Sequence, residues 1–192
     1  RHFFIDEFQD TSELQWQNLV PLIDNALSGE DDFGKKGSLM IVGDPKQAIY
    51  RWRGGKAEQF MELSADTNPF SNPSKETISL STNYRSYEKV VQFNNEIFKF
   101  LASEFEDAAY QNLYENYSHQ NFNSKKGGFV NISFLNNDLL TDDTITKDDL
   151  YLDQVLKTIN NVLSQGFSLG DIVVLTRKSK DGVKVANYLT EN

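Results

Sequence analysis

Residues 2–7 have the sequence HFFIDE, a largely apolar run that leads directly into two neighbouring carboxylates. A continuous apolar run of this length is typical of a strand covered on both faces of a sheet. In open α/β sheets, ligands bind at the carboxyl ends of such strands. We therefore predict a buried strand over 2–5 that presents Asp6 and Glu7 at its end. By itself, the acidic pair also fits a strand end with two solvated carboxylates.

A helix pattern follows this strand and leads to a second strand. Ser12 and Gln15 have the spacing of a capping box, which marks the first turn of a helix. Apolar residues then recur at helical spacing from Trp16 to Leu27, and the apolar run 39–42 predicts a second buried strand. Strand, helix and strand in this order are typical of parallel α/β sheets with flanking helices.

The same alternation continues through the remaining residues. The stretch 67–74 contains prolines and polar residues without periodicity, and we place the boundary between two domains there. The stretch 107–126, rich in Asn, Gln and Tyr, predicts a long surface excursion, and the acidic stretch 136–149 predicts a mobile loop. Further strands are predicted at 77–80, 129–135 and 171–175, and further helices at 57–63, 88–105, 149–164 and from 181 onward.

Composition restricts the classes of function. Hydrophobic residues make up 39% of the chain and charged residues 24%, which is ordinary for a folded soluble protein. Because no apolar run approaches the roughly 18 residues of a membrane span, and no signal-peptide pattern is present, we expect a cytoplasmic protein without membrane partners. The absence of cysteine and the two isolated histidines exclude a zinc site of the usual kind. A net charge of -9 means that any contact with DNA must be local.

One stretch nearly matches a phosphate-binding loop. Residues 29–36 have the sequence GEDDFGKK, which departs from the pattern G-x-x-x-x-G-K-[ST] at its last position. Lys36 stands where a hydroxyl should reach Mg²⁺, and three consecutive acids would repel phosphates. The stretch also follows a helix and precedes a strand, the reverse of the order that directs backbone amides at phosphate. We predict a solvated turn.

An aromatic and basic stretch follows the second strand. Tyr50, Trp52 and Arg53 lie within the sequence YRWRGG at 50–55. Aromatic faces next to positive charge bind single-stranded nucleic acids by stacking and by phosphate contacts. An aromatic cluster that caps the core is the alternative. Because the stretch comes directly after GDPKQ, we favour a loop that binds single-stranded DNA through these three side chains.

Three stretches, taken in order, resemble motifs II, III and IV of superfamily 1 helicases. They are IDEFQDT at 5–11, VGDPKQAIYRWRG at 42–54 and TNYRS at 82–86. The resemblance is to the UvrD/Rep/PcrA and RecB/AddA family, and DPKQAIY at 44–50 is more similar to RecB and AddA. It implies RecA-like motor folds of the P-loop NTPase class, which move 3′ to 5′ on single-stranded DNA at the expense of ATP.

The resemblance also implies a role for each matching residue of the ATP site. Asp6 would hold Mg²⁺ and Glu7 would activate the attacking water. Gln47 would sense the γ-phosphate, and Tyr84 would stack on the adenine. Arg85 would reach the γ-phosphate as an arginine finger, for which a guanidinium is suited because it is always charged and offers a fixed fork of donors. An isolated Tyr-Arg pair would otherwise be an exposed cation at a strand end.

The resemblance is incomplete, because no stretch fits the phosphate loop or the family's motifs V and VI. We therefore expect an internal fragment of a longer helicase, with residues 1–70 from the first motor domain and 71–192 from the second. The expected partners are single-stranded DNA or DNA with a 3′ overhang, and a nuclease domain or partner subunits of a helicase-nuclease complex. The alternatives are a DNA-binding remnant that hydrolyses no ATP, and a generic nucleotide-binding α/β domain, which would leave Trp52 unexplained.

Overall fold

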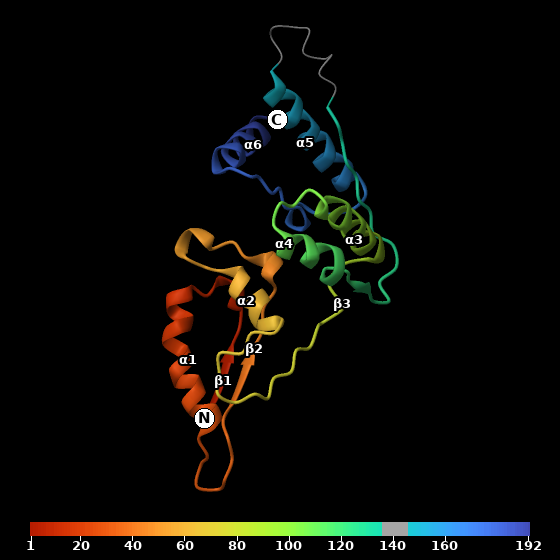
Figure 1. The fold of residues 1–192 in the computed structure, drawn as a ribbon. Coiled ribbons are helices and arrows are strands. Elements are labelled where there is room, and N and C mark those ends of the chain that lie inside the picture. Colours follow the sequence, from red (N-terminus) through yellow and green to blue (C-terminus); the bar gives the residue numbers. More distant parts are fainter. Residues whose placement is uncertain (136–145) are drawn as a thin grey trace. The chain divides into compact units, whose positions relative to one another are not determined.

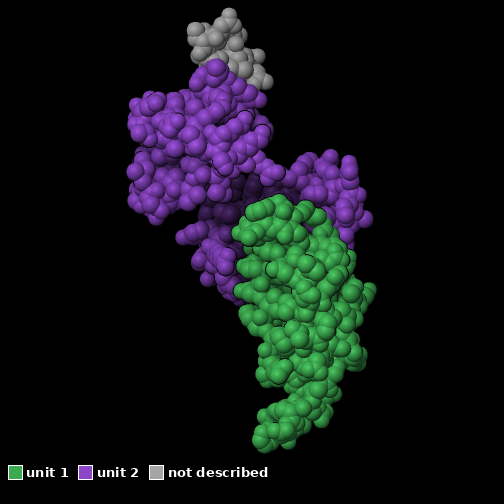
Figure 2. All heavy atoms as spheres, turned by 90° about the vertical axis from the view of Figure 1, so that its left-hand side faces the viewer, with its two compact units in different colours: residues 1–81 green, residues 82–192 purple. Residues whose placement is uncertain are grey.

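The computed structural model describes residues 1–135 and 146–192, which form two compact units, Arg1–Ser81 and Thr82–Asn192 (Figures 1 and 2). We describe each unit by itself. The boundary between the two compact units, at 81/82, is defined by contacts within the chain. The boundary near residue 70 was predicted for two motor domains, and it stays a prediction. Of the predicted mobile stretch 136–149, residues 136–145 lie outside the described residues.

The first unit is built on two parallel strands and the helix that connects them. β1 (His2–Ile5) pairs with β2 (Ser38–Ile41), with Phe3 opposite Leu39 and Ile5 opposite Ile41. The connecting helix α1 (Glu13–Ser28) lies alongside the strands (Figure 1). The unit also contains α2 (Ala57–Ser64) and short 3-10 turns at Phe8–Asp10, Pro45–Gln47 and Arg51–Arg53.

The core of this unit forms where α1 packs against the strands. Phe8, Trp16 and Ile23 are buried, and the ring of Phe8 meets that of Trp16 edge-on at 4.9 Å. Four strand residues, Phe3, Ile5, Leu39 and Ile41, pack against this cluster. The strands predicted at 2–5 and 39–42 and the apolar face of the helix are thus confirmed. The prediction that these strands are covered on both faces was wrong, because Phe4 and Met40 on the opposite face are 64% and 59% exposed. Partly buried residues from the rest of the unit complete the core: Leu19, Val20, Leu27, Phe60, Leu63 and Phe70.

Both ends of α1 follow the sequence signals. The Ser12 hydroxyl accepts a hydrogen bond from the Gln15 backbone at 3.3 Å, and the Gln15 side chain accepts one from the Ser12 backbone at 2.9 Å, which is the predicted capping box. After the helix, residues 29–36 form an exposed turn in which the Asp31 carboxylate accepts the backbone amides of Phe33 and Lys35. These hydrogen bonds lower the pKa of Asp31. The predicted solvated turn is confirmed.

The predicted connection at 67–74 belongs to the first unit. The ring of Phe70 meets that of Trp16 edge-on at 5.9 Å. The Ser71 backbone and hydroxyl both donate to the Asp24 carboxylate, at 2.7 and 2.9 Å. This segment is therefore attached to α1, and the chain leaves the first unit only after residue 81.

The second unit is mainly helical. β3 (Thr82–Asn83) and β4 (Asn121–Phe122) form a two-residue parallel pair beside α3 (Glu88–Ala102). The stretch 107–126, predicted as a surface excursion, instead contains α4 (Ala108–Asn112) and a π-helical turn at Leu113–Tyr117, and its Tyr114 stacks on Phe98 of α3 at 5.6 Å. The unit ends with α5 (Lys147–Ser164), a 3-10 turn at Leu169–Asp171 and α6 (Ser179–Glu191).

Three predicted strands are absent. Residues 77–80, 129–135 and 171–175 form no strand in the described chain. Their apolar side chains are largely exposed: Leu80 by 85%, Phe134 by 91% and Leu175 by 90%. These predictions were wrong because a strand needs a hydrogen-bonded neighbour, which the described residues do not supply. The small parallel sheets and their helices are compatible with an α/β class. No described helix has both the length and the apolar character needed to cross a membrane.

Candidate functional site

Asp6 and Glu7 leave the end of β1 through a sharp turn, and both are exposed to solvent. Glu7 has φ 51° and ψ 42°, and it is the one described residue other than glycine with a positive φ. A left-handed conformation costs a side-chain-bearing residue about 1–2 kcal/mol, and such strain is frequent at functional sites. The Asp6 carboxylate accepts the Glu7 backbone amide at 2.9 Å. The turn therefore presents two adjacent carboxylates at the carboxyl end of the strand, as predicted for residues 2–7.

A buried glutamine joins this turn to the loop after β2. Gln9 is only 1% exposed, and both ends of its side-chain amide are used. Nε2 donates to the Glu7 carboxylate at 2.6 Å, and Oε1 accepts the Asp44 backbone amide at 3.0 Å. A Cβ atom at Gly43 would lie 2.5 Å from Gln9 Oε1 and 3.2 Å from the Phe60 ring, so only glycine leaves room for this bridge.

Sequence reasoning assigned no role to Gln9. The residue lies within IDEFQDT, but a polar side chain directly before Asp10 carries no signal of burial. The neighbouring Phe8 was the available indication, because an aromatic residue just after a buried strand is usually packed in the core. Gln9 is buried beside it.

Asp44 organises the turn that carries Gln47. Its carboxylate accepts the Lys46 backbone amide at 3.0 Å, the Lys46 ammonium at 2.8 Å and the Gln47 side-chain amide at 3.2 Å. Burial by itself raises the pKa of the Asp44 carboxyl. The hydrogen bonds and charge of Lys46 outweigh this, so the net pKa lies below the ordinary value. Gln47 is thus held three residues from the backbone amide that Gln9 binds.

The aromatic loop lies on the surface of the first unit. Trp52 is 78% exposed, whereas Tyr50 is 38% exposed. The Arg53 guanidinium lies 5.3 Å from the centre of the Trp52 ring and 5.9 Å from that of Tyr50. Gly54 has φ 87°, which ends the 3-10 turn and returns the chain toward the core. This exposure excludes the alternative in which Trp52 caps the core, and it leaves an aromatic face beside a cation in solvent.

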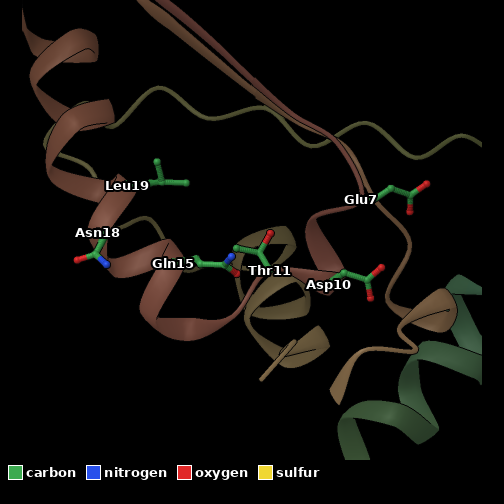
Figure 3. A pocket seen from close by; sticks show the side chains of 6 residues that line it. All are labelled: Glu7, Asp10, Thr11, Gln15, Asn18 and Leu19. Atoms are coloured by element: carbon green, nitrogen blue, oxygen red, sulfur yellow. The ribbon is translucent and has the colours of Figure 1, made fainter. Parts of the chain in front are cut away.

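An open cavity of about 490 Å³ adjoins the acidic turn. Figure 3 shows its six labelled residues, which come from the segment after β1 and from the first turns of α1. The hollow is wide open to solvent and not an enclosed site, so it leaves the Glu7 side of the turn accessible. The lining residues are Glu7, Asp10, Thr11, Gln15, Asn18 and Leu19.

Tyr84 and Arg85 lie in the second unit. Both are exposed, Tyr84 by 73%. The side-chain oxygen of Asn83 accepts the backbone amides of Arg85 and Ser86, each at 2.9 Å, which closes a tight turn just after β3. The structure thus brings Asp6, Glu7 and Gln47 into one part of the first unit, whereas Tyr84 and Arg85 belong to the second unit.

Comparison with known proteins finds a family match in the N-terminal part of the chain. Residues 1–68 match the UvrD/REP helicase N-terminal domain. This helicase-like region contains the acidic turn, Gln9, Gln47 and the aromatic loop. The chain is 38% identical over 94 residues to RecBCD enzyme subunit RecB of Chlamydia trachomatis, which is 49% of the chain and 8% of that relative.

Two further relatives have different names. The chain is 36% identical over 97 residues to DNA helicase II of Haemophilus influenzae, covering 50% of the chain and 11% of the relative. It is 35% identical over 96 residues to an ATP-dependent helicase/nuclease subunit of Clostridium kluyveri, covering 50% and 7%. The chain thus spans about a tenth of the length of these curated relatives. Its helicase-like region is similar to superfamily 1 helicases of both the UvrD and the RecB type.

Proposed function

We propose that the chain is part of an ATP-dependent DNA helicase that moves 3′ to 5′ on single-stranded DNA. In this proposal, residues 1–70 come from the first motor domain and residues 71–192 from the second. The RecB-like and helicase/nuclease relatives support partner subunits or a nuclease domain in the complete protein. Its substrate is single-stranded DNA or a duplex with a 3′ overhang.

The buried Gln9 bridge is the observation that carries the proposal. It connects the Glu7 carboxylate to the backbone of Asp44, and the chain continues from there through Gln47 to the aromatic loop. A motor protein must couple the hydrolysis of ATP to a change in how it binds DNA. Because hydrogen bonds are stronger in the low-dielectric interior than in water, a buried amide bonded at both ends couples the two loops more firmly than a solvated contact would.

The acidic turn fits a magnesium-bound nucleotide. Mg²⁺ is usually held by one or two carboxylates together with substrate phosphates and water. Asp6 and Glu7 offer this minimal set, and the described residues contain no cluster of three or more metal-ligating side chains that would enclose an ion by themselves. Asp6 would hold the ion, which would neutralise charge on the phosphates of ATP.

Four side chains would take the other roles in ATP hydrolysis. Glu7 would orient and deprotonate the attacking water. The hydrogen bond that Gln9 donates holds the Glu7 carboxylate in one orientation. Gln47 would contact the γ-phosphate. From the second unit, Tyr84 would stack on the adenine, and Arg85 would stabilise charge that develops on the γ-phosphate.

The aromatic loop would hold a nucleotide of the DNA strand. Trp52 offers an exposed ring for stacking, and Arg53 places a positive charge 5.3 Å from it. This arrangement also explains how a chain of net charge -9 can bind DNA, because the contact is confined to one loop. Repair and recombination are the processes in which a helicase of this type would act.

The test uses the full-length protein with three measurements: DNA-stimulated ATP hydrolysis, single-strand binding and unwinding of duplexes with a 3′ or a 5′ overhang. Glu7→Gln should lower ATP turnover by roughly 10²–10⁴-fold, the usual contribution of a general base, while DNA binding is retained. Glu62→Gln in α2 is the matched control and should leave turnover unchanged. Unwinding should require the 3′ overhang.

Two outcomes would overturn the proposal. A full-length protein that binds single-stranded DNA without hydrolysing ATP would be a DNA-binding remnant of a helicase. Equal turnover in the wild type and Glu7→Gln would remove the acidic turn from the chemistry.

A further inference from the structure

The turn that carries Arg85 is held by a group of side-chain amides from distant parts of the second unit. The Asn83 side chain donates from Nδ2 to the Gln120 side-chain oxygen at 2.9 Å. The backbone oxygen of Asn83 accepts from Asn123 Nδ2 at 2.7 Å. Together with Asn95 of α3, these residues form what we call the amide cluster. Both the side chain and the backbone of Asn83 are therefore fixed from the 120–123 segment.

Gln120 is itself anchored to helix α3. Asn95 donates from Nδ2 to the Gln120 backbone oxygen at 2.8 Å and accepts the Gln120 backbone amide at 3.0 Å. One Asn95 side chain thus satisfies both backbone polar groups of Gln120 and fixes them relative to α3. The Lys125 ammonium adds a long contact of 3.4 Å to the Arg85 backbone oxygen.

The amide cluster fixes the backbone turn that carries Arg85. Its side chains are half-buried, so their hydrogen bonds are shielded from competing water more than surface contacts are. Arg85 is exposed, and none of the ion pairs in the described part of the chain includes its guanidinium. The Arg85 side chain is therefore positioned by its own backbone. Asn83 in turn fixes that backbone by accepting the Arg85 amide.

We propose that Gln120 is a positioning residue for Arg85, which acts through Asn83 with Asn95 as its anchor. The proposal rests on the function proposed above, in which Arg85 contacts the γ-phosphate. Gln120 lies 35 residues after Arg85 and outside the matched range 1–68. Its hydrogen bonds go to Asn83 and Asn95, so the proposed role requires no contact with nucleotide or DNA. Its effect should therefore appear in kcat for ATP hydrolysis and little in KM, because the turn's geometry matters most when charge develops on the phosphate.

The experiment compares near-isosteric variants of Gln120 in the full-length protein. Gln120→Met removes the acceptor for Asn83 Nδ2 while keeping the length of the side chain. Gln120→Glu keeps an acceptor and should rescue activity. Gln111→Met is the matched control, because the Gln111 side chain in the same stretch donates to the Glu115 carboxylate and not to the amide cluster. Gln120→Met should lower kcat by about tenfold, since a misplacement of about 1 Å can cost roughly a hundredfold and the loss of one bond should shift the turn by less.

A double-mutant comparison separates positioning from general damage. Arg85→Ala should lower kcat by roughly 10³-fold with little change in DNA affinity. On that background Gln120→Met should cost nothing further, because residues that act through one another are not additive. If Gln120→Met does not yield folded protein, Asn95→Asp provides the second variant, since it loses the donor to the Gln120 backbone. Its kcat should fall in the same way.

Three results would overturn the proposal. Wild-type kcat in Gln120→Met, with Arg85→Ala strongly impaired, would leave the proposed function intact and remove only the positioning role. An equal loss on both backgrounds, or an equal loss in Gln120→Glu, would mean that Gln120 supports the fold and not Arg85. Wild-type kcat in Arg85→Ala would overturn the arginine finger and the positioning role together.

Discussion

Replacing Trp52 by alanine separates DNA binding from packing more clearly than any other change in the chain. Trp52 is 78% exposed, so roughly a fifth of the residue's surface is covered. An aromatic side chain buries up to about 250 Å² when it is fully enclosed, so about 50 Å² is covered here. At about 25 cal/mol per Å², this burial contributes about 1 kcal/mol to folding.

The expected losses of Trp52→Ala are therefore unequal. A core tryptophan would cost about 3–5 kcal/mol on truncation, whereas the exposed ring should cost only about 1 kcal/mol of unfolding free energy. Loss of a base stack should cost on the order of 1–3 kcal/mol of DNA binding, so single-strand affinity should fall about tenfold or more. Because a stack contacts a π-face and reads no hydrogen-bond pattern, this loss should be nearly independent of DNA sequence.

The assay pairs fluorescence-anisotropy titration of single-stranded oligonucleotides with denaturant unfolding, both on the full-length protein. Phe33→Ala is the matched control, because Phe33 is an aromatic residue with 87% exposure in the turn after α1. It should leave DNA affinity unchanged. Arg53→Gln should instead reduce the salt dependence of binding, since a lost phosphate contact releases one counterion fewer. A large fall in stability with DNA binding intact in the folded fraction would refute the stacking role of Trp52.

Three other predictions follow from the first unit. The 192-residue chain by itself should show no DNA-stimulated ATP hydrolysis, because its sequence contains no phosphate loop; turnover that survives repurification and disappears in Glu7→Gln would contradict this. Gln9→Leu should lower the unfolding free energy by about 1–3 kcal/mol in denaturant titrations, because it leaves a buried backbone amide without its acceptor; an unchanged midpoint would exclude the bridge. The pKa of Asp44 is lowered in the folded chain, so its stabilising contribution is complete above the ordinary Asp range near 4 and is lost as the pH falls toward the lowered value. Asp44→Asn should therefore flatten the acid branch of stability against pH, and an identical acid branch in wild type and variant would argue against the Lys46 contact.

Local signals in the sequence predicted local structure well. The spacing of Ser12 and Gln15 specifies a reciprocal cap within one turn, and the structure has both of its hydrogen bonds. The apolar runs 2–5 and 39–42 formed strands because each is the other's neighbour. Residues 77–80, with the sequence TISL, alternate polar and apolar side chains and remain unpaired. Such an alternation records which side chains need burial and not which strand provides it.

The candidate site divides in the same way. Residues with distinctive chemistry, such as Glu7, Trp52 and Arg85, could be selected from motifs alone. Gln9 and Gln120 could not, because a neutral amide has the same sequence signature on a surface as in a buried bridge. Their importance depends on contacts across 35 and 37 residues of chain, and only the folded structure supplies those contacts.

The close approach of Gly43 to Gln9 restricts how the two positions can vary among relatives. An alanine at 43 needs a shorter side chain at 9, but a shorter side chain no longer spans from Glu7 to the Asp44 backbone. No single substitution at either position therefore leads to another working pair. We expect lineages to keep both residues or to lose both together.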